Sequence, residues 1–150
     1  MGRQRVMTIA SVLREKGRDV ISVQPTTKVQ EIAGIIASRR IGAVLVMDKD
    51  KRVAGIVSER DVVKAVAARP DGLHALQAQE IMTRAVAYAT PQTTIEEAME
   101  MMDQGYFRHL PVLENGDLVG IISIRDVVKA RIQRHEHEAD NLLSYIHGRG

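Results

Sequence analysis

The side chains best suited to chemistry in this chain occur in one short pattern that is written twice. "GIVSERDVVKAV" spans Gly55 to Val66, "GIISIRDVVKAR" spans Gly120 to Arg131, and nine of the twelve positions are identical. Each copy keeps a serine, an arginine and an aspartate at the same places. A carboxylate can accept hydrogen bonds from the hydroxyls of a ribose, and an arginine fork can bind phosphate. The pattern therefore contains groups that a nucleotide needs.

The same pattern also has a purely structural interpretation. Ser58 and Asp61, like Ser123 and Asp126, have the spacing of a capping box at the start of a helix. In that motif the serine accepts a backbone N–H, and the aspartate lies favourably at the positive end of the helix dipole. The capping box accounts for the serine and the aspartate, but not for the arginine between them. A turn that opens a helix also presents free N–H groups to an anion, so both interpretations use one geometry.

These patterns lie within two longer repeats that predict the same order of elements. Short apolar segments at 20–23 and 85–89 predict strands, each followed by a proline-containing turn and an amphipathic helix. A β-hairpin follows in each repeat, and Asn115-Gly116 is a type I′ turn signal. A second helix begins near Ser58 or Ser123. The predicted fold class is α/β (α+β), with the order β-α-β-β-α repeated.

Neither repeat can bury its apolar sheet face alone at this size, so we expect the two to pack on each other. The docking residues expected in a helical tail are Leu142, Leu143 and Ile146. The expected organisation is an N-terminal helix within 1–19, a first domain at 20–68, a linker at 69–79, a second domain at 80–134 and the tail at 135–150.

Composition limits the other functions that the chain could have. Its 150 residues are 45% hydrophobic and 3% aromatic, which predicts a small aliphatic core. The absence of cysteine excludes disulfides, zinc–thiolate sites and thiol catalysis. The formal net charge is only +2, without a basic stripe for nucleic acid. The longest apolar run is about five residues, and the N-terminus lacks the apolar segment of a signal peptide. We therefore expect a soluble cytoplasmic protein that binds neither nucleic acid nor membrane.

The chain resembles the CBS domain family, named for cystathionine β-synthase. The resemblance rests on the G-h-h-[S/T]-x-x-D pattern at Gly55–Asp61 and Gly120–Asp126. "RHLPV" at 108–112, its first-repeat counterpart "GAVLV" at 42–46 and "IMT" at 81–83 are also typical of the family. The resemblance implies that two such domains pair with pseudo-twofold symmetry around two clefts between their sheets. Such clefts typically bind AMP, ADP, ATP, NAD or S-adenosylmethionine.

The resemblance also implies roles for particular residues. Asp61 and Asp126 would take ribose hydroxyls, and Ser58 and Ser123 would bond the ribose or a phosphate. The other implied ligand-contacting residues are Ile21 and Ala87 near the adenine, Met82 and Thr83 at the edge of one cleft, Arg60, Arg108, His109 and Arg125 toward phosphates, and Gly42 and Ala43 as the first-repeat counterparts of Arg108 and His109.

The two repeats differ where phosphate chemistry matters. The first repeat has Gly42-Ala43 where the second has Arg108-His109, and Glu59 where the second has Ile124. We therefore expect two clefts of different charge, with different affinities or ligands, such as one mononucleotide and one larger adenosine ligand like NAD. Two equal sites in a calorimetric titration would contradict this hypothesis.

Together these features predict a stand-alone CBS pair that senses an adenine nucleotide (AMP, ATP or NAD) without catalysis, as a homodimer, with output through an unidentified protein effector. The alternatives are a structural dimerisation module with vestigial clefts, or a binder of S-adenosylmethionine. No hydroxyl or thiol nucleophile is recognisable beside His109, so we expect no enzyme activity. In "HEHE" at 135–138, His135 and His137 project about 200° apart on a helix, so we expect no metal site.

Overall fold

The chain forms two compact units. A computed structural model describes residues 6–84, 87–105 and 107–147, without the side chains of 137, 138 and 140–147. The first-repeat unit is Asp19–Tyr88, and the second-repeat unit combines Met1–Arg18 with Ala89–Gly150. The docking side chains expected in the tail, at 142, 143 and 146, lie outside the described residues.

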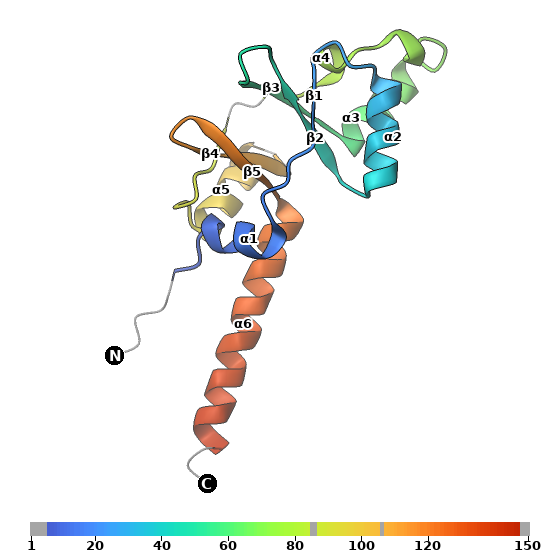
Figure 1. The fold of residues 1–150 in the computed structure, drawn as a ribbon. Coiled ribbons are helices and arrows are strands. Elements are labelled where there is room, and N and C mark those ends of the chain that lie inside the picture. The colour runs from blue at the N-terminus through green and yellow to red at the C-terminus, as the bar shows by residue number, and fades with distance from the viewer. Residues whose placement is uncertain (1–5, 85–86, 106, 148–150) are drawn as a thin grey trace. The chain divides into compact units, whose positions relative to one another are not determined.

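The first-repeat unit is a three-stranded sheet accompanied by helices (Figure 1). Its elements are β1 (Ser22–Val23), α2 (Val29–Arg39), β2 (Ala43–Met47), β3 (Val53–Ser58), α3 (Glu59–Ala68), a 3₁₀ turn (Leu73–Ala75) and α4 (Ala78–Ile81). β1 runs parallel to β2, and β2 pairs antiparallel with β3. Ile32 and Ile36 of α2 pack with Val44, Val46 and Val57 of the sheet in a buried cluster. Val57, which is fully buried in this cluster, immediately precedes the last residue of β3.

The second-repeat unit repeats this hairpin and its helices. Its elements are α1 (Ile9–Lys16), α5 (Ile95–Gly105), β4 (His109–Glu114), β5 (Asp117–Ser123) and α6 (Ile124–His147). β4 and β5 pair antiparallel, and Asn115 and Gly116 between them have φ values of 54° and 83°. These left-handed conformations are those of the predicted type I′ turn. Ile95, Leu110 and Ile122 are fully buried in this unit.

Two expected elements differ in the structure. Of the strand expected at 85–89, residues 85 and 86 lie outside the described residues, and Ala89 forms only a parallel bridge to Val112. The tail expected from 135 continues α6, a 24-residue helix, because no glycine or proline interrupts it. None of the helices in the described ranges is long and apolar enough to cross a membrane.

α1 and α4 occupy corresponding places in the two units. The N–H of Ala10 in α1 donates to the carbonyl of Pro91, and the N–H of Gln79 in α4 donates to the carbonyl of Pro25, both at 2.9 Å. Pro25 and Pro91 are equivalent positions of the two repeats. α1 therefore precedes the first repeat in the sequence but packs on the second.

The glycine that opens the repeated pattern lets these segments approach the hairpin. A Cβ at Gly55 would lie 2.8 Å from both the Met82 sulfur and the Thr83 carbonyl oxygen. A Cβ at Gly120 would lie 2.7 Å from Cδ2 of Leu13. Both contacts are too short for a real side chain, so close packing explains why glycine occurs at both positions.

We expect Gly55→Ala to lower the free energy of unfolding by about 1–3 kcal/mol, and Gly120→Ala by less. The new methyl group meets the Thr83 backbone in the first case, but only the end of the flexible Leu13 side chain in the second. Urea unfolding of both variants beside the wild type measures the difference. A larger loss for Gly120→Ala would contradict this account.

Candidate functional site

The first candidate site is the turn at residues 58–61, here called the Ser58 turn. β3 ends at Ser58, and α3 begins at the next residue. Asp61 Oδ2 accepts the backbone N–H of Ser58 at 2.9 Å and its hydroxyl at 3.0 Å. The N–H of Asp61 donates to Ser58 Oγ at 3.3 Å. The turn therefore forms the capping box that its spacing predicted.

The second candidate site, the Ser123 turn at residues 123–126, has the same geometry. Asp126 Oδ2 accepts the N–H of Ser123 at 2.8 Å, and the N–H of Asp126 donates to Ser123 Oγ at 3.1 Å. The cap engages only Oδ2, and no hydrogen bond among the described residues reaches Asp126 Oδ1. Capping thus leaves one carboxylate oxygen available to a ligand, and the structural and functional interpretations are compatible.

Each turn contains one arginine, and Arg108 lies beside the Ser123 turn. Arg60, Arg125 and Arg108 are exposed. Their guanidinium groups take part in no hydrogen bond or ion pair with another described residue. An exposed guanidinium without an internal carboxylate partner is well suited to bind a phosphate.

The sheet register places two further predicted residues beside each turn. The Gly42 carbonyl accepts the N–H of Glu59 at 3.0 Å, and Ala43 is the register partner of Ser58. In the second-repeat unit the same two positions are Arg108 and His109. The N–H of Ile124 donates to the Arg108 carbonyl at 2.8 Å, and His109 is the register partner of Ser123. The structure thus brings these residues to their turns.

The remaining predicted residues divide into two groups. Thr83 exchanges both backbone hydrogen bonds with Ile56, at 2.8 and 2.9 Å, and its hydroxyl lies 3.5 Å from Asp61 Oδ1. Met82 packs beside Thr83 on the core cluster of the first-repeat unit, as does Ile21 from the β1 side. Ala87 is half-buried outside both sheets, and no contact in the described ranges connects it to the Ser58 turn.

Sequence reasoning missed Lys16, which reaches the Ser123 turn from the end of α1. Its Nζ lies 2.5 Å from Asp126 Oδ2 and donates to the carbonyl of Ile121 at 2.7 Å. In the first-repeat unit the equivalent carbonyl, that of Ile56, accepts the backbone N–H of Thr83. The donor to this carbonyl is thus a lysine ammonium in the second-repeat unit and a backbone N–H in the first-repeat unit. The signal that could have shown this is an alignment of α1 with α4, since Lys16 and Asp126 are 110 residues apart.

The Asp126 carboxyl titrates below its ordinary range because of these contacts. Burial raises its pKa, but hydrogen bonds from Lys16 and Ser123 and the positive charge of Lys16 together outweigh burial, so the pKa lies below the usual 3.8. The Asp126 carboxylate therefore stabilises the folded protein above its unfolded pKa of about 3.9. This contribution is lost as the pH falls through the lower pKa of the folded state.

We expect Lys16→Met to lower the free energy of unfolding near pH 7 by about 1 kcal/mol, because both side chains are partly exposed. The difference from the wild type should shrink as the pH falls through the lowered pKa of Asp126, since the carboxyl is protonated in both proteins below it. Urea unfolding at several pH values, with an NMR titration of Asp126, measures this. A difference that stays constant down to pH 3 would show that the ion pair contributes nothing.

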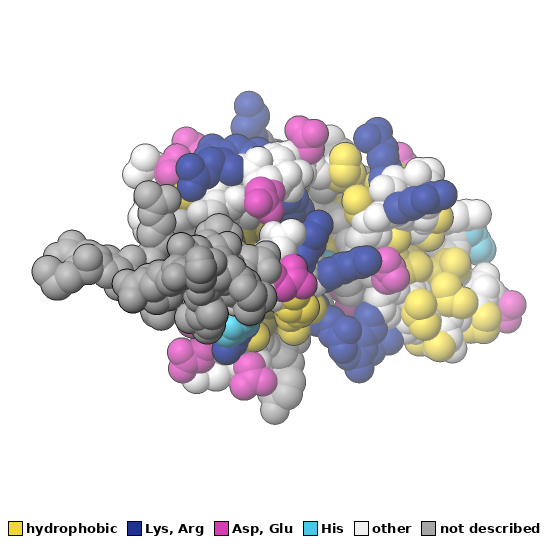
Figure 2. Space-filling model, turned by 90° about the horizontal axis from the view of Figure 1, so that it is seen from below, with side chains coloured by type: hydrophobic (Ala, Val, Ile, Leu, Met, Phe, Trp, Pro, Cys, Tyr) yellow, Lys and Arg dark blue, Asp and Glu magenta, His cyan; other side chains and the backbone are white. Residues whose placement is uncertain are grey.

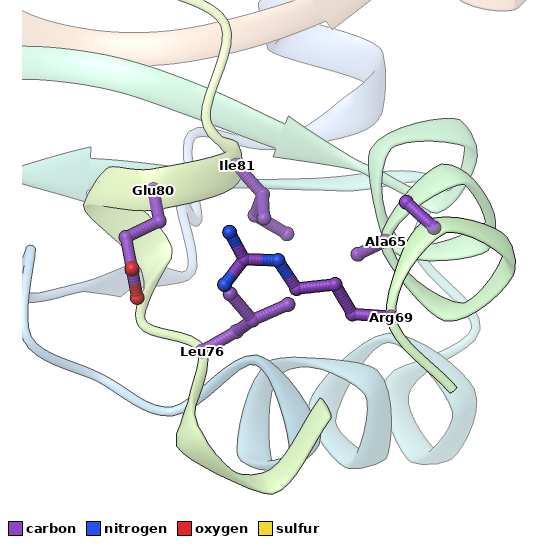
Figure 3. Close-up of a pocket in the computed structure, with 6 residues that line it drawn as sticks. Ala65, Arg69, Leu76, Glu80 and Ile81 are labelled. Carbon is purple, nitrogen blue, oxygen red and sulfur yellow. The ribbon is translucent and has the colours of Figure 1, made fainter. Parts of the chain in front are cut away.

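A pocket of about 200 Å³ lies at the other end of α3 (Figure 3). It is lined by Ala65, Ala68, Arg69, Leu76, Glu80 and Ile81, and the Arg69 side chain extends into it. The pocket is about three helical turns from Ser58. None of the sequence-predicted ligand residues lines it. Within the described residues, no three His, Asp or Glu side chains gather as metal ligands would.

The comparisons with known proteins identify the family of these repeats. The family model of the CBS domain matches residues 11–68 and 78–133. The chain belongs to the CBS domain family. The predicted resemblance is thereby confirmed, and so is the predicted fold of two CBS repeats, which matches solved CBS-domain structures.

Individual CBS-domain proteins resemble this chain over most of its length. A CBS-domain-containing protein from Agrobacterium tumefaciens is 45% identical with a TM-score of 0.80, over 87% of this chain and 98% of that one. A CBS-domain protein from Pyrobaculum aerophilum, solved in complex with AMP, is 32% identical with a TM-score of 0.70, over 80% and 89% of the two chains. An uncharacterised 17.7 kDa protein from Acidianus ambivalens is 33% identical, over 87% and 79%.

Proposed function

We propose that this CBS pair is a non-catalytic regulatory module that binds an adenine nucleotide such as AMP, ATP or NAD. The observation that carries the proposal is the pair of side chains that each turn presents. Each combines a capped aspartate with an exposed arginine that has no internal partner. The AMP complex of the relative from Pyrobaculum aerophilum supports the choice of an adenosine ligand.

Each group of the turn has a distinct task in this proposal. Asp61 and Asp126 accept hydrogen bonds from ribose hydroxyls, while Arg60 and Arg125 bind phosphate oxygens. The backbone N–H groups at the start of α3 and α6 favour the anionic part of the ligand. Binding regulates by shifting the population between conformations in proportion to their difference in affinity, and a protein effector reads the shift.

Calorimetric titration of the full chain with AMP, ATP, NAD and S-adenosylmethionine tests the proposal. We expect saturable binding of at least one nucleotide with a Kd below about 1 mM. The same ligand should raise the unfolding temperature, because it binds the folded state only. If none of the four compounds binds or changes the unfolding temperature, the turns are caps alone and the chain is a structural module.

We propose in addition that the protein acts as a homodimer through the outer faces of α3 and α6. Val63 of α3 and Val128 of α6 are equivalent repeat positions, and their side chains are 65% and 40% exposed. Val66 is a second exposed apolar side chain on α3, and Ile132 is a second one on α6. Hydrophobic side chains also gather over the helices of the first-repeat unit in Figure 2. A second copy presents the same apolar side chains, as a twofold interface requires.

A further inference from the structure

The two turns differ in formal charge. Residues 59–61 of the Ser58 turn, Glu-Arg-Asp, have a formal charge of −1. Residues 124–126 of the Ser123 turn, Ile-Arg-Asp, are neutral in sum, and Lys16 bound to Asp126 makes that site +1. Arg108 adds another positive charge beside the Ser123 turn, where the first repeat has Gly42. A phosphate is therefore favoured more strongly at the Ser123 turn than at the Ser58 turn.

Lys16 contributes more than charge. Two contacts hold its ammonium in place, and one of its N–H donors is not used by them. An ammonium has three N–H donors. One donates to Asp126 Oδ2 and a second to the Ile121 carbonyl. The Lys16 side chain is 31% exposed, so solvent reaches it. The third donor and Asp126 Oδ1 thus lie in one small site, as a cation beside a hydroxyl acceptor.

We propose that Lys16 is the ligand-selecting residue of the Ser123 turn, giving it a preference for adenosine ligands with a phosphate. This inference rests on the proposed function and adds to it a division of labour between the turns. Asp126 accepts the ribose, while Lys16 and the arginines of this unit neutralise the phosphate. At the Ser58 turn, Glu59 and the absence of a lysine beside Asp61 leave Arg60 as the only cation of residues 58–61, so the preference for a phosphate is weaker there.

Titrations with AMP and with adenosine test this selection. They are made on Asp61→Ala protein, so that binding at the Ser123 turn is measured alone. We expect the further change Lys16→Met to weaken AMP binding about tenfold or more, and adenosine binding by less than about threefold. Lys16→Gln should behave like Lys16→Met, and Lys16→Arg should keep the preference for AMP. Arg14→Met, on the same helix, is the control, since Arg14 contacts Ser11 and not the turn.

The outcomes separate this inference from the proposed function. If the wild type binds neither AMP nor adenosine, the proposed function fails and no selection exists. If the wild type binds AMP but Lys16→Met leaves AMP binding unchanged or tighter, the proposed function stands and Lys16 does not select the ligand. Equal losses for AMP and adenosine would show that Lys16 only positions Asp126. A loss confined to AMP, restored in Lys16→Arg, supports the proposal.

Discussion

We expect the replacement of Asp61 or Asp126 by alanine to lower the affinity of its turn for an adenosine ligand by about 10- to 100-fold. In the proposed function the carboxylate oxygen that the cap does not use, Oδ1, accepts a ribose hydroxyl, and a hydrogen bond to a charged group contributes about 1.5–3 kcal/mol. Calorimetric titration of each single variant with AMP and with adenosine measures the loss. Because the two turns differ in charge, we expect Asp126→Ala to weaken AMP more than Asp61→Ala does.

The capping boxes make asparagine the informative comparison. Alanine at position 61 also removes the acceptor for the N–H of Ser58, so the free energy of unfolding should fall by about 1 kcal/mol. Asparagine keeps one oxygen for that N–H but loses the charge, so Asp61→Asn and Asp126→Asn should retain most of the stability and still lose affinity. Variants that lose stability as alanine but bind AMP normally as asparagine would show that the aspartates are helix caps only.

The double variant Val63→Glu, Val128→Glu should be a monomer at concentrations where the wild type is a dimer. Burying a valine contributes about 1.5–3 kcal/mol, and a glutamate at the same place would have to lose its hydration. Two valines in each copy would enter the interface, so the dimer dissociation constant should rise at least about 100-fold. Sedimentation velocity over a concentration series measures the change.

Lys51→Glu is the matched control for this experiment. Lys51 lies in the exposed turn between β2 and β3. The substitution Lys51→Glu changes the net charge by the same amount as the two valine substitutions, but it lies on neither α3 nor α6. This variant should remain a dimer. If the wild type sediments as a monomer at all concentrations, or if the valine variant remains a dimer, the two helix faces are not the interface.

Much of the fold could be predicted because it depends on local sequence. The repeated pattern places a helix start after a strand, and the capping boxes at Ser58 and Ser123 have the geometry that their spacing predicts. The Asn115-Gly116 turn likewise depends on two adjacent residues that adopt positive φ. Short-range hydrogen bonds and backbone preferences act within a few residues, so the sequence pattern is enough to predict them.

What the sequence did not show depends on contacts between distant segments. Lys16 meets Asp126 only because α1 packs on the second repeat, and no periodicity near either residue indicates this. The carboxylate predicted as a ribose acceptor therefore has an internal cation beside it. In the same way, the role of Gly55 depends on Thr83, whose carbonyl comes close only when the segment after α4 pairs with β3 at Ile56.

The position of α1 also implies an order in which the two units fold during synthesis. The segment 19–88 is continuous, so the first-repeat unit can close as soon as it leaves the ribosome. α1 is made before that segment, but Ile9 and Leu13, both buried in the finished protein, must wait for residues beyond 88. A nascent chain that stalls at this point exposes an apolar helix next to a completed unit. α1 is thus synthesised before the first-repeat unit but covered only after it, and chaperones that bind exposed apolar segments could act on α1 in this interval.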